Sequence, residues 1–256
     1  MKTYLINIVK SLENLSKTLD ETSILIDKPW ALIDSDNTIQ KLIFKKDKTL
    51  ILSKDGQVVM GKWDYLSESK SLLINRGNDI ILCNKGFLDE GVMVLKMDGT
   101  NNNFFVLANE NVIPDLDAYT YLKKLRYKNL NIVTKKLKDG RILEIFKSIE
   151  SDNNHARVGN RVTIELDNVC DGTYRNENSN IKYVIRNSKI ASIIYEMTYK
   201  TKNGFEIMIE QKYQEFYSKG ENVWINETQA KDGSYKVIGR RNIIVENGKI
   251  KKKNFF

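Results

Sequence analysis

The stretch Asp232-Gly233-Ser234-Tyr235 repeats the earlier stretch Asp171-Gly172-Thr173-Tyr174, and the same order of features surrounds both tetrads. A glycine and alternating branched residues precede each tetrad, and an Asn-x-Lys-Ile sequence follows it. The corresponding positions are Gly159, Val162, Ile164, Val184, Asn187, Lys189 and Ile190 in the first copy and Gly220, Val223, Ile225, Ile244, Asn247, Lys249 and Ile250 in the second. The second half of this 256-residue chain is therefore predicted to be one small unit that occurs twice.

Each tetrad is interpreted as the marker of a hairpin. An Asp-Gly pair is typical of a tight turn, because glycine adopts positive φ angles without steric cost. The Thr or Ser then re-enters a strand, and the Tyr packs its ring while its hydroxyl reaches a polar partner. Calcium binding is disfavoured, because the second copy has too few further carboxylate or amide oxygens. We expect two β-modules, at 129–198 and 199–256, each with about five short strands.

Similar turn signals punctuate the first half of the chain. Asp55-Gly56 and Asp98-Gly99 separate runs of branched and aromatic residues, which favour antiparallel strands. These runs predict a β-domain over 23–110, either a barrel or a strongly curled sheet. Its expected strands are 24–33, 38–44, 48–53, 57–65, 71–75, 79–84, 92–97 and 103–108.

Two short helices are expected beside this domain, at 1–22 and 111–128. In the first, apolar residues recur at intervals of three and four, the period of an amphipathic helix. They are Leu5, Ile8, Leu12, Leu15 and Leu19. This helix packs on the domain that follows or docks on another chain. The second is a linker helix that Asn111 or Asp115 caps, so the predicted fold class is all-β with two short helices.

The composition is that of a protein with a hydrophobic core, since 41% of its residues are hydrophobic and 29% are charged. Apolar runs such as Ile80-Ile81-Leu82-Cys83 are far too short to span a membrane, and the N-terminus lacks the pattern of a signal peptide. We therefore expect a cytoplasmic protein without membrane insertion. Cys83 and Cys170 have no CxxC partners, and nothing in the pattern requires a disulfide between them.

Positive charge is concentrated in the second half of the chain. Residues 1–128 hold 18 Lys and Arg against 17 Asp and Glu, whereas residues 129–256 hold 23 against 16. The most basic stretch predicts a surface that binds an acidic partner or a nucleic acid. Its candidate residues are Arg240, Arg241, Lys249, Lys251, Lys252 and Lys253. The plainer interpretation is a lysine-rich composition with most lysines on solvated strand faces.

No sequence motif nominates a catalytic or metal site. The one histidine, His155, follows polar residues in an expected loop, where an exposed role is the simplest interpretation. A Walker loop, GxGxxG, HExxH, GxSxG and paired CxxC motifs are all missing from the sequence. We therefore predict a protein that is not an enzyme, with no catalytic residue, no metal ligand and no cofactor.

Three aromatic residues of the first β-domain are candidates for an apolar ligand pocket. Trp30, Trp63 and Tyr65 could line the interior of a barrel, although aromatic residues at strand positions more often belong to a core. The sequence leaves both interpretations open.

Part of this domain, about residues 28–108, resembles the lipocalin-like domains that are common in bacteria. The resemblance is carried by Phe44, Asp55-Gly56, Gly61-Lys62-Trp63-Asp64-Tyr65 and Ser71-Leu72-Leu73-Ile74. It implies an up-and-down β-barrel and no particular ligand. Lipocalins proper have G-x-W in the first strand, where this chain has Lys28-Pro29-Trp30. The layout of the repeated units is similar to small add-on β-modules of bacterial and phage assembly proteins.

Three functions fit these observations. The leading hypothesis is a non-enzymatic role in protein–protein interaction, as a structural component or adaptor of a larger bacterial or phage assembly, because tandem β-modules offer strand edges to partners. The alternative is a carrier of a small apolar ligand in the barrel. The third is nucleic-acid binding by the basic C-terminal half.

Overall fold

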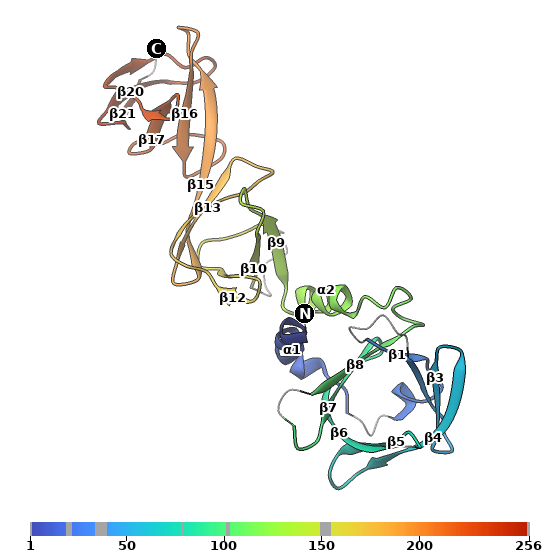
Figure 1. The fold of residues 1–256 in the computed structure, drawn as a ribbon. Helices are drawn as coiled ribbons and strands as arrows, with labels where there is room; N and C mark the ends of the chain where they lie inside the picture. Colours follow the sequence, from blue (N-terminus) through green and yellow to red (C-terminus); the bar gives the residue numbers. More distant parts are fainter. Residues whose placement is uncertain are drawn as a thin grey trace. The chain divides into compact units, whose positions relative to one another are not determined.

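The computed structural model describes residues 2–18, 22–33, 40–77, 79–100, 103–148 and 155–254. The chain divides into two compact units, Met1–Asn129 and Leu130–Phe256. Strands dominate both units and two α-helices accompany them (Figure 1), which confirms the all-β class with two short helices. The division lies at the end of the second helix, where the charge balance of the sequence also changes.

The first unit is an eight-stranded, closed antiparallel barrel. Each strand pairs with the next along the chain, and β1 pairs with β8 (Figure 1). The strands are β1 (Trp30–Leu32), β2 (Gln40–Phe44), β3 (Thr49–Lys54), β4 (Gln57–Leu66), β5 (Ser71–Asn75), β6 (Ile80–Leu88), β7 (Val92–Met97) and β8 (Phe104–Asn109). This is the up-and-down architecture that the lipocalin resemblance implied. Unrelated proteins share that architecture, so it does not by itself assign a family.

The first strand is shorter than expected. A 3-10 helix (Thr22–Ile24) occupies the predicted start, Asp27 has a φ of 56°, and β1 begins only at Trp30. Pro29 has no amide hydrogen for a ladder, which confines it to the edge or beginning of a strand. Within the predicted strand 38–44, Thr38 and Ile39 lie outside the described residues, and β2 begins at Gln40.

The Asp-Gly turns of the barrel form as predicted. Asp55 and Gly56 have φ angles of 51° and 78°, the geometry of a two-residue type I′ hairpin between β3 and β4. Gly99, with a φ of 70°, lies in the turn between β7 and β8. Such turns fix the register of each hairpin and therefore decide which side chains face the core.

Large aromatic side chains fill the barrel. Trp30 and Phe44 are fully buried, and Trp63 packs edge-on against Phe44 with ring centroids 5.5 Å apart. Each indole N–H donates to a backbone carbonyl, that of Leu25 for Trp30 (3.2 Å) and that of Lys45 for Trp63 (2.9 Å). Because their rings are buried and their indole N–H groups are hydrogen-bonded, Trp30 and Trp63 are fixed parts of the core.

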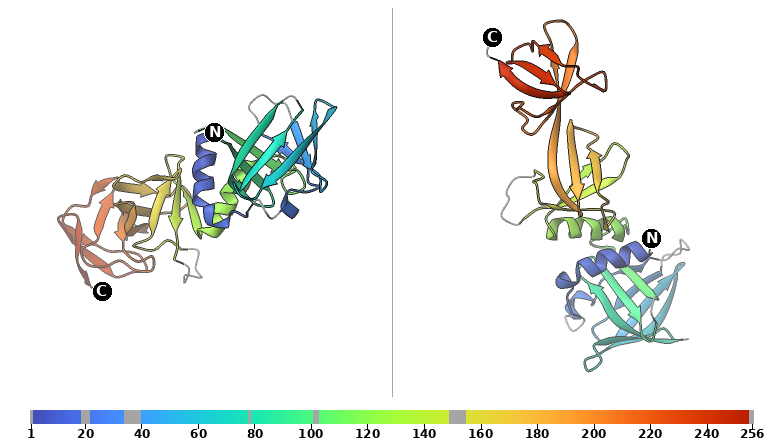
Figure 2. Two further views of the ribbon diagram at one scale, coloured as in Figure 1. Left: turned by 90° about the horizontal axis from the view of Figure 1, so that it is seen from below. Right: turned by 90° about the vertical axis from the view of Figure 1, so that its left-hand side faces the viewer.

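The N-terminal helix packs within its own unit. α1 (Lys2–Ser11) buries Ile8 and is followed by a 3-10 turn (Glu13–Leu15), and the Lys17 amide donates to the Leu88 carbonyl of β6 at 2.8 Å. Helix α2 (Ala118–Asn129) lies beside α1 (Figures 1 and 2). Helix α1 ends at Ser11, before the end of the apolar stripe predicted for the N-terminal helix. The side chain of Leu5 and the whole of Leu19 lie outside the described residues.

The cap of α2 differs from the two predicted candidates. The carboxylate of Asp117 accepts the Thr120 amide at 2.9 Å, which satisfies one of the free N–H groups of the first turn. Asn111 and Asp115 precede this cap, and Leu122 is buried on the apolar side of the helix.

The second unit is one antiparallel sheet that curls into two modules. The strands are β9 (Ile132–Lys136), β10 (Ile142–Phe146), β11 (Arg161–Ile164), β12 (Asp167–Asn168), β13 (Gly172–Arg175), β14 (Ile181–Arg186), β15 (Lys189–Lys200), β16 (Glu206–Gln211), β17 (Asn222–Ile225), β18 (Thr228–Gln229), β19 (Gly233–Tyr235), β20 (Asn242–Glu246) and β21 (Lys249–Asn254). The long strand β15 ends the first module and begins the second (Figure 2). The predicted boundary at 198/199 therefore lies inside a strand.

Each module is rolled up around its own hydrophobic cluster. In module 1 the strand order is β9-β10-β11-β15-β14-β13, and a bridge between Leu137 and Asn176 brings the two outer strands together. In module 2 the order is β15-β16-β17-β21-β20-β19, with a bridge between Thr201 and Val237 in the same place.

The predicted repeat extends to individual hydrogen bonds. Matched pairs are Gly159 N to Ile190 O (2.7 Å) and Gly220 N to Ile250 O (2.8 Å), and Val162 N to Ser188 O (2.9 Å) and Val223 N to Gly248 O (2.8 Å). A bulge interrupts β14 and β20 at corresponding places, between Val184 and Ile185 and between Ile244 and Val245. The two modules therefore share one backbone plan.

The role predicted for the tetrads is wrong in one respect. The glycine of each tetrad begins a strand, β13 or β19, so the Asp-Gly pair does not form the hairpin turn. Instead, the Asp171 carboxylate accepts the amide of Asn187 at 2.7 Å, and Asp232 accepts that of Asn247 at 2.7 Å. Both asparagines have positive φ angles in the next hairpin turn. The aspartate thus satisfies an amide that the tight turn leaves without a ladder partner.

The tyrosine of each tetrad behaves as predicted. The Tyr174 hydroxyl donates to the Cys170 carbonyl at 2.9 Å, and the Tyr235 hydroxyl donates to the Lys231 carbonyl at 2.7 Å. Both rings pack against the core cluster of their module. Each tetrad therefore fixes the segment before its own strand and joins it to the turn after the next strand.

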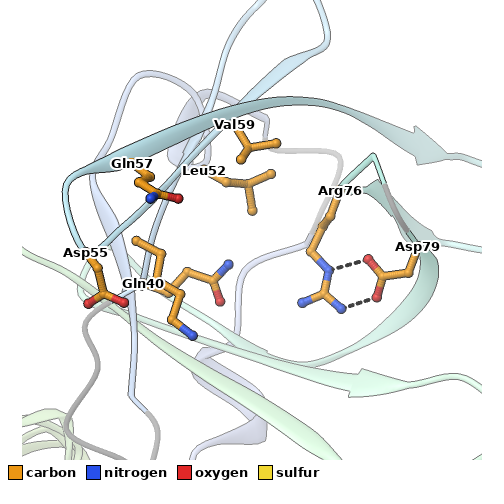
Figure 3. A pocket seen from close by; sticks show the side chains of 8 residues that line it. Gln40, Leu52, Asp55, Gln57, Val59, Arg76 and Asp79 are labelled. Atoms are coloured by element: carbon orange, nitrogen blue, oxygen red, sulfur yellow. Dashed lines mark hydrogen bonds and ion pairs between the residues drawn. The ribbon is translucent and has the colours of Figure 1, made fainter.

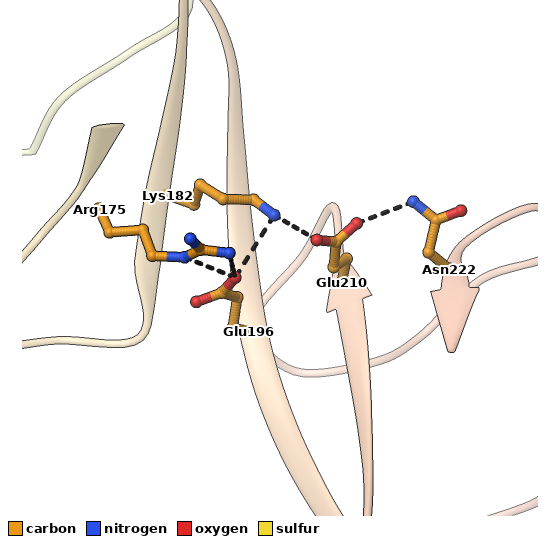
Figure 4. A network of polar contacts seen from close by, with 5 residues as sticks. All are labelled: Arg175, Lys182, Glu196, Glu210 and Asn222. Atoms are coloured by element: carbon orange, nitrogen blue, oxygen red, sulfur yellow. Dashed lines mark hydrogen bonds and ion pairs between the residues drawn. The ribbon is translucent and has the colours of Figure 1, made fainter. Parts of the chain in front are cut away.

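A network of charged residues lies where the two modules share β15 (Figure 4). Lys182 forms an ion pair with Glu210 and lies 3.3 Å from a carboxylate oxygen of Glu196, while Asn222 donates to Glu210 at 2.8 Å. The side chains of Lys182 and Glu210 are 9% and 10% exposed. Burial raises the pKa of Glu210, but hydrogen bonds from Lys182 and Asn222 outweigh it and hold that pKa below its ordinary value. The network joins β14 of module 1 to β16 and β17 of module 2.

Candidate functional site

One strand of the barrel has an unpaired edge. Strand β4 has ten residues and β5 has five, so β4 pairs with β3 alone until Lys62, which lies opposite Asn75. Backbone groups alternate in direction along an antiparallel strand, so the N–H and C=O groups of Val58 and Met60 point away from β3. None of the described residues pairs with this side of residues 57–60, which we call the β4 edge.

Apolar side chains cover both faces of the β4 edge. Val58, Val59 and Met60 are 62%, 50% and 60% exposed. Proteins usually protect a free strand edge with charged residues, proline or a bulge, because an exposed apolar edge pairs readily with another chain. Here three consecutive apolar residues occupy the edge. An extended peptide would therefore find unpaired backbone groups and apolar contacts at the same place.

A hollow of about 480 Å³ lies beside the β4 edge, and we call it the edge hollow (Figure 3). It is lined by Gln40, Leu52, Lys54, Asp55, Gln57, Val59, Arg76 and Asp79. Arg76 Nε donates to the Asp79 carboxylate at 2.8 Å, and this hydrogen bond lowers the pKa of Asp79. The ion pair fixes the turn between β5 and β6, which forms one wall of the hollow.

The interior of the barrel offers little room for a ligand. Its apolar cavity next to the edge hollow measures about 20 Å³, roughly the space of one water molecule. The residues predicted to line a ligand pocket belong to the packed core instead. Trp30 and Trp63 are buried, and Tyr65 packs against the same core cluster while partly buried.

The residues predicted to form one basic surface do not all gather in one place. Lys251 forms an ion pair with Glu246 at 2.7 Å, and Lys249 and Lys252 are exposed along β21. The other three line a hollow of about 300 Å³ in module 2, which we call the cationic hollow. It is lined by Arg240, Arg241, Lys253, Phe216 and Tyr217.

Backbone carbonyls hold two of these cations in position. Arg240 Nη1 donates to the Glu215 carbonyl at 2.6 Å, and Lys253 Nζ donates to the Tyr217 carbonyl at 3.0 Å. The Tyr217 hydroxyl donates to the Arg241 carbonyl, and burial raises the pKa of Tyr217 to about 12. The loop between β16 and β17 is thus tied to the turn before β20 and to β21, which brings the cations together.

Other candidate groups stand apart from both hollows. His155 is exposed, and the described residues contain no group of three or more His, Cys, Asp or Glu side chains that could hold a metal ion. Both cysteines are free thiols; burial raises the pKa of Cys83 to about 11, whereas Cys170 is exposed. None of the helices in the described ranges has the length and apolar character that a membrane span requires.

The β4 edge was not among the sites predicted from the sequence, although the sequence carries a signal for it. A strand with one solvated face alternates apolar and polar residues, whereas Val58-Val59-Met60 is apolar on both faces next to a tight turn. The lack of a backbone partner for β4 leaves no comparable signal in the sequence, because it depends on where β5 ends.

Comparison of the chain with protein-family models, with curated proteins and with solved structures finds no match.

Proposed function

We propose that this chain is a non-enzymatic interaction protein that binds an extended segment of a partner protein by strand addition at the β4 edge. The observation that carries the proposal is the coincidence of unpaired backbone groups and exposed apolar side chains at Val58 and Met60. In the cell this binding would make the chain a component or adaptor of a larger assembly.

Strand addition at this edge has a favourable physical basis. A partner strand would pair with the backbone groups of Val58 and Met60 and would cover their side chains. Complete burial of a fully exposed side chain of this size contributes roughly 1.5–3 kcal/mol, so covering these two, which are 62% and 60% exposed, contributes a part of that for each. The edge hollow would accept side chains of the added strand that point toward Leu52 and Val59. Specificity would come from its polar lining, including the Arg76–Asp79 ion pair.

The test begins with random peptides displayed on phage and selected on the full chain. An enriched peptide, synthesised and added to the protein, is expected to slow hydrogen exchange of the Val58 and Met60 amides. Val58→Lys should weaken peptide binding at least tenfold. The matched control is Val158→Lys, which changes an equally exposed valine (64%) of the other unit and should leave binding unchanged.

A second variant tests the backbone contact itself. Val58→Pro removes one amide that faces away from β3, a position where proline is tolerated in a strand. Circular dichroism should show a folded barrel, and peptide binding should be lost. Selected peptides that protect other amides and ignore both Val58 variants would refute the proposal. Sedimentation equilibrium separates a further outcome, because a dimer that Val58→Lys dissolves would mean that the edge binds a second copy of this chain.

The carrier hypothesis has less support. The apolar cavity in the barrel interior measures about 20 Å³, far below the roughly 300 Å³ of ordinary small-molecule pockets. Native mass spectrometry of freshly purified protein tests it directly, since a carrier would retain a stoichiometric apolar ligand.

A further inference from the structure

The loop between β16 and β17 displays a pair of aromatic rings beside the cationic hollow. Tyr213 and Phe216 are each 48% exposed and stack with ring centroids 5.0 Å apart and an interplanar angle of 25°. Phe216 also lines the cationic hollow. One surface therefore combines a flat aromatic face with a cluster of positive charge.

This loop is held in a defined conformation. The carboxylate of Glu221 accepts two backbone amides of the loop, that of Lys212 at 2.8 Å and that of Ser218 at 2.6 Å. Tyr217 is buried and packs edge-on against Tyr199 with ring centroids 5.5 Å apart. Because the loop is preorganised, a ligand that stacks on it loses little of its binding free energy to ordering the protein.

The positive charges of Arg240 and Lys253 in the cationic hollow are available to a ligand. Within the described part of the chain, neither Arg240 nor Lys253 has a carboxylate within salt-bridge distance. Both instead use a hydrogen bond to a carbonyl, which positions the cation without neutralising it. Lys251 differs, since Glu246 accompanies it.

The module framework does not require these cations. The pairing of β14 with β15 and of β20 with β21 places Asn180, Ile181 and Ile193 of module 1 where module 2 has Arg240, Arg241 and Lys253. The corresponding positions of module 1 are therefore neutral, although the backbone plan is the same. A structural explanation of the three cations would predict them in both modules.

We propose that the cationic hollow and the Tyr213–Phe216 pair form a binding site for single-stranded nucleic acid. Phosphate groups would bind Arg240, Arg241 and Lys253, since guanidinium and ammonium groups are strong donors to phosphate. A base would stack on the exposed aromatic pair, a contact that tolerates any sequence. A duplex hides its base faces and could not make the second contact. The site lies in the second unit and is independent of the β4 edge.

The experiment measures fluorescence anisotropy of labelled dT12 and rU12 with the full chain at 50 and 200 mM salt. Binding should weaken steeply with salt. The double variant Arg240→Gln with Lys253→Gln should bind at least tenfold more weakly, and its logarithmic salt slope should be smaller by about 1.4, as expected for two lost phosphate contacts on a single strand. Glutamine keeps an N–H donor for each carbonyl, so the loop should stay folded. The two oligonucleotides show whether DNA or RNA is preferred.

A charge-matched control separates a site from general basicity. Lys249→Gln with Lys251→Gln removes two positive charges from β21 outside the hollow and should change affinity less than twofold. Tyr213→Ala with Phe216→Ala changes only exposed rings and should weaken binding roughly tenfold without altering the salt slope. Three results would overturn the proposal: no binding at 50 mM salt, equal losses in the control and the hollow variants, or a heparin fragment that competes as well as dT12 while the aromatic variant binds normally.

Discussion

Module 1 and module 2 have the same backbone plan and different surfaces. The aspartate, the tyrosine and the bulge of the last hairpin recur at corresponding places, with the same hydrogen bonds. Where module 2 has Arg240, Arg241 and Lys253, module 1 has Asn180, Ile181 and Ile193. The hydrogen bonds of the tetrads therefore recur, whereas the side chains at these three positions differ. The comparison therefore distinguishes the residues that build a module from the residues that could give one module its own binding site.

The junction is a second place where the modules differ. Lys182 is buried on β14 with Glu210 and Glu196, whereas the corresponding position on β20 is Asn242, which is partly exposed. The charged network lies where β15 passes from one module to the next.

The largest effect is expected from breaking this junction. Lys182→Met leaves two carboxylates without their buried cation and should lower the free energy of unfolding of the second unit by about 3 kcal/mol. Asn242→Met, at the corresponding place of module 2, should cost less than about 0.5 kcal/mol. Urea unfolding followed by circular dichroism measures both. Equal costs at the two positions would mean that the junction is not a special feature of β15.

The junction should also be sensitive to acid. Because the pKa of Glu210 is lowered in the folded state, its contribution to stability is complete above its ordinary value of 4.5 and is lost as the pH falls through the folded pKa. The stability difference between the natural chain and Glu210→Gln should therefore be large at pH 7 and should shrink below pH 4.5. Urea unfolding at a series of pH values measures this. A difference that stays constant down to pH 3 would contradict the assignment.

A moderate and equal effect is expected from the two tetrads. Asp171→Ala and Asp232→Ala each remove one hydrogen bond to a turn amide and should each cost about 1 kcal/mol. The Asp→Asn variants keep a side-chain oxygen and should cost less. Thermal unfolding of the four variants checks the comparison. Clearly unequal costs for the two alanine variants would show that the shared hydrogen bonds do not carry equal weight.

The smallest effect is expected at Cys170, whose place in module 2 is held by Lys231. A thiol reagent should modify the exposed Cys170 quickly, and the free energy of unfolding should change by less than about 0.5 kcal/mol. Cys83 is buried, and its raised pKa keeps it in the unreactive thiol form, so it should react only when the barrel unfolds. A fluorophore on Cys170 would then report module 1 separately. Rapid modification of both thiols in the folded protein would contradict the buried position of Cys83.

Much of the fold could be predicted from the sequence, because its strongest signals are local. Turns such as Asp55-Gly56 require positive φ angles that few residues adopt, so the hairpins and their registers follow from short stretches. Helix α2 and the repeat could also be predicted, because their signals are local in the sequence too. Errors appear where local preference is not decisive: Asp-Gly at the tetrads starts a strand, and Pro29 delays β1.

The candidate sites could be predicted only in part. Arg240, Arg241 and Lys253 were in the predicted basic set, but the sequence could not separate them from Lys249, Lys251 and Lys252. Their separation depends on a loop whose own amides Glu221 accepts and that Tyr217 joins to Arg241 and to Lys253 of β21. Trp30 and Trp63 were correctly recognised as barrel residues, and only the packing showed that they fill the core.

The sequence by itself therefore determined the all-β class, the duplicated module and the basic character of the second half, because turn chemistry, alternation and charge are properties of short stretches. Only the tertiary structure decided that the barrel interior is filled, that β4 extends beyond β5, that β15 belongs to both modules, and that three cations surround one hollow. Each of these depends on which distant segments pair and where a neighbouring strand ends, and no single stretch of sequence contains that information.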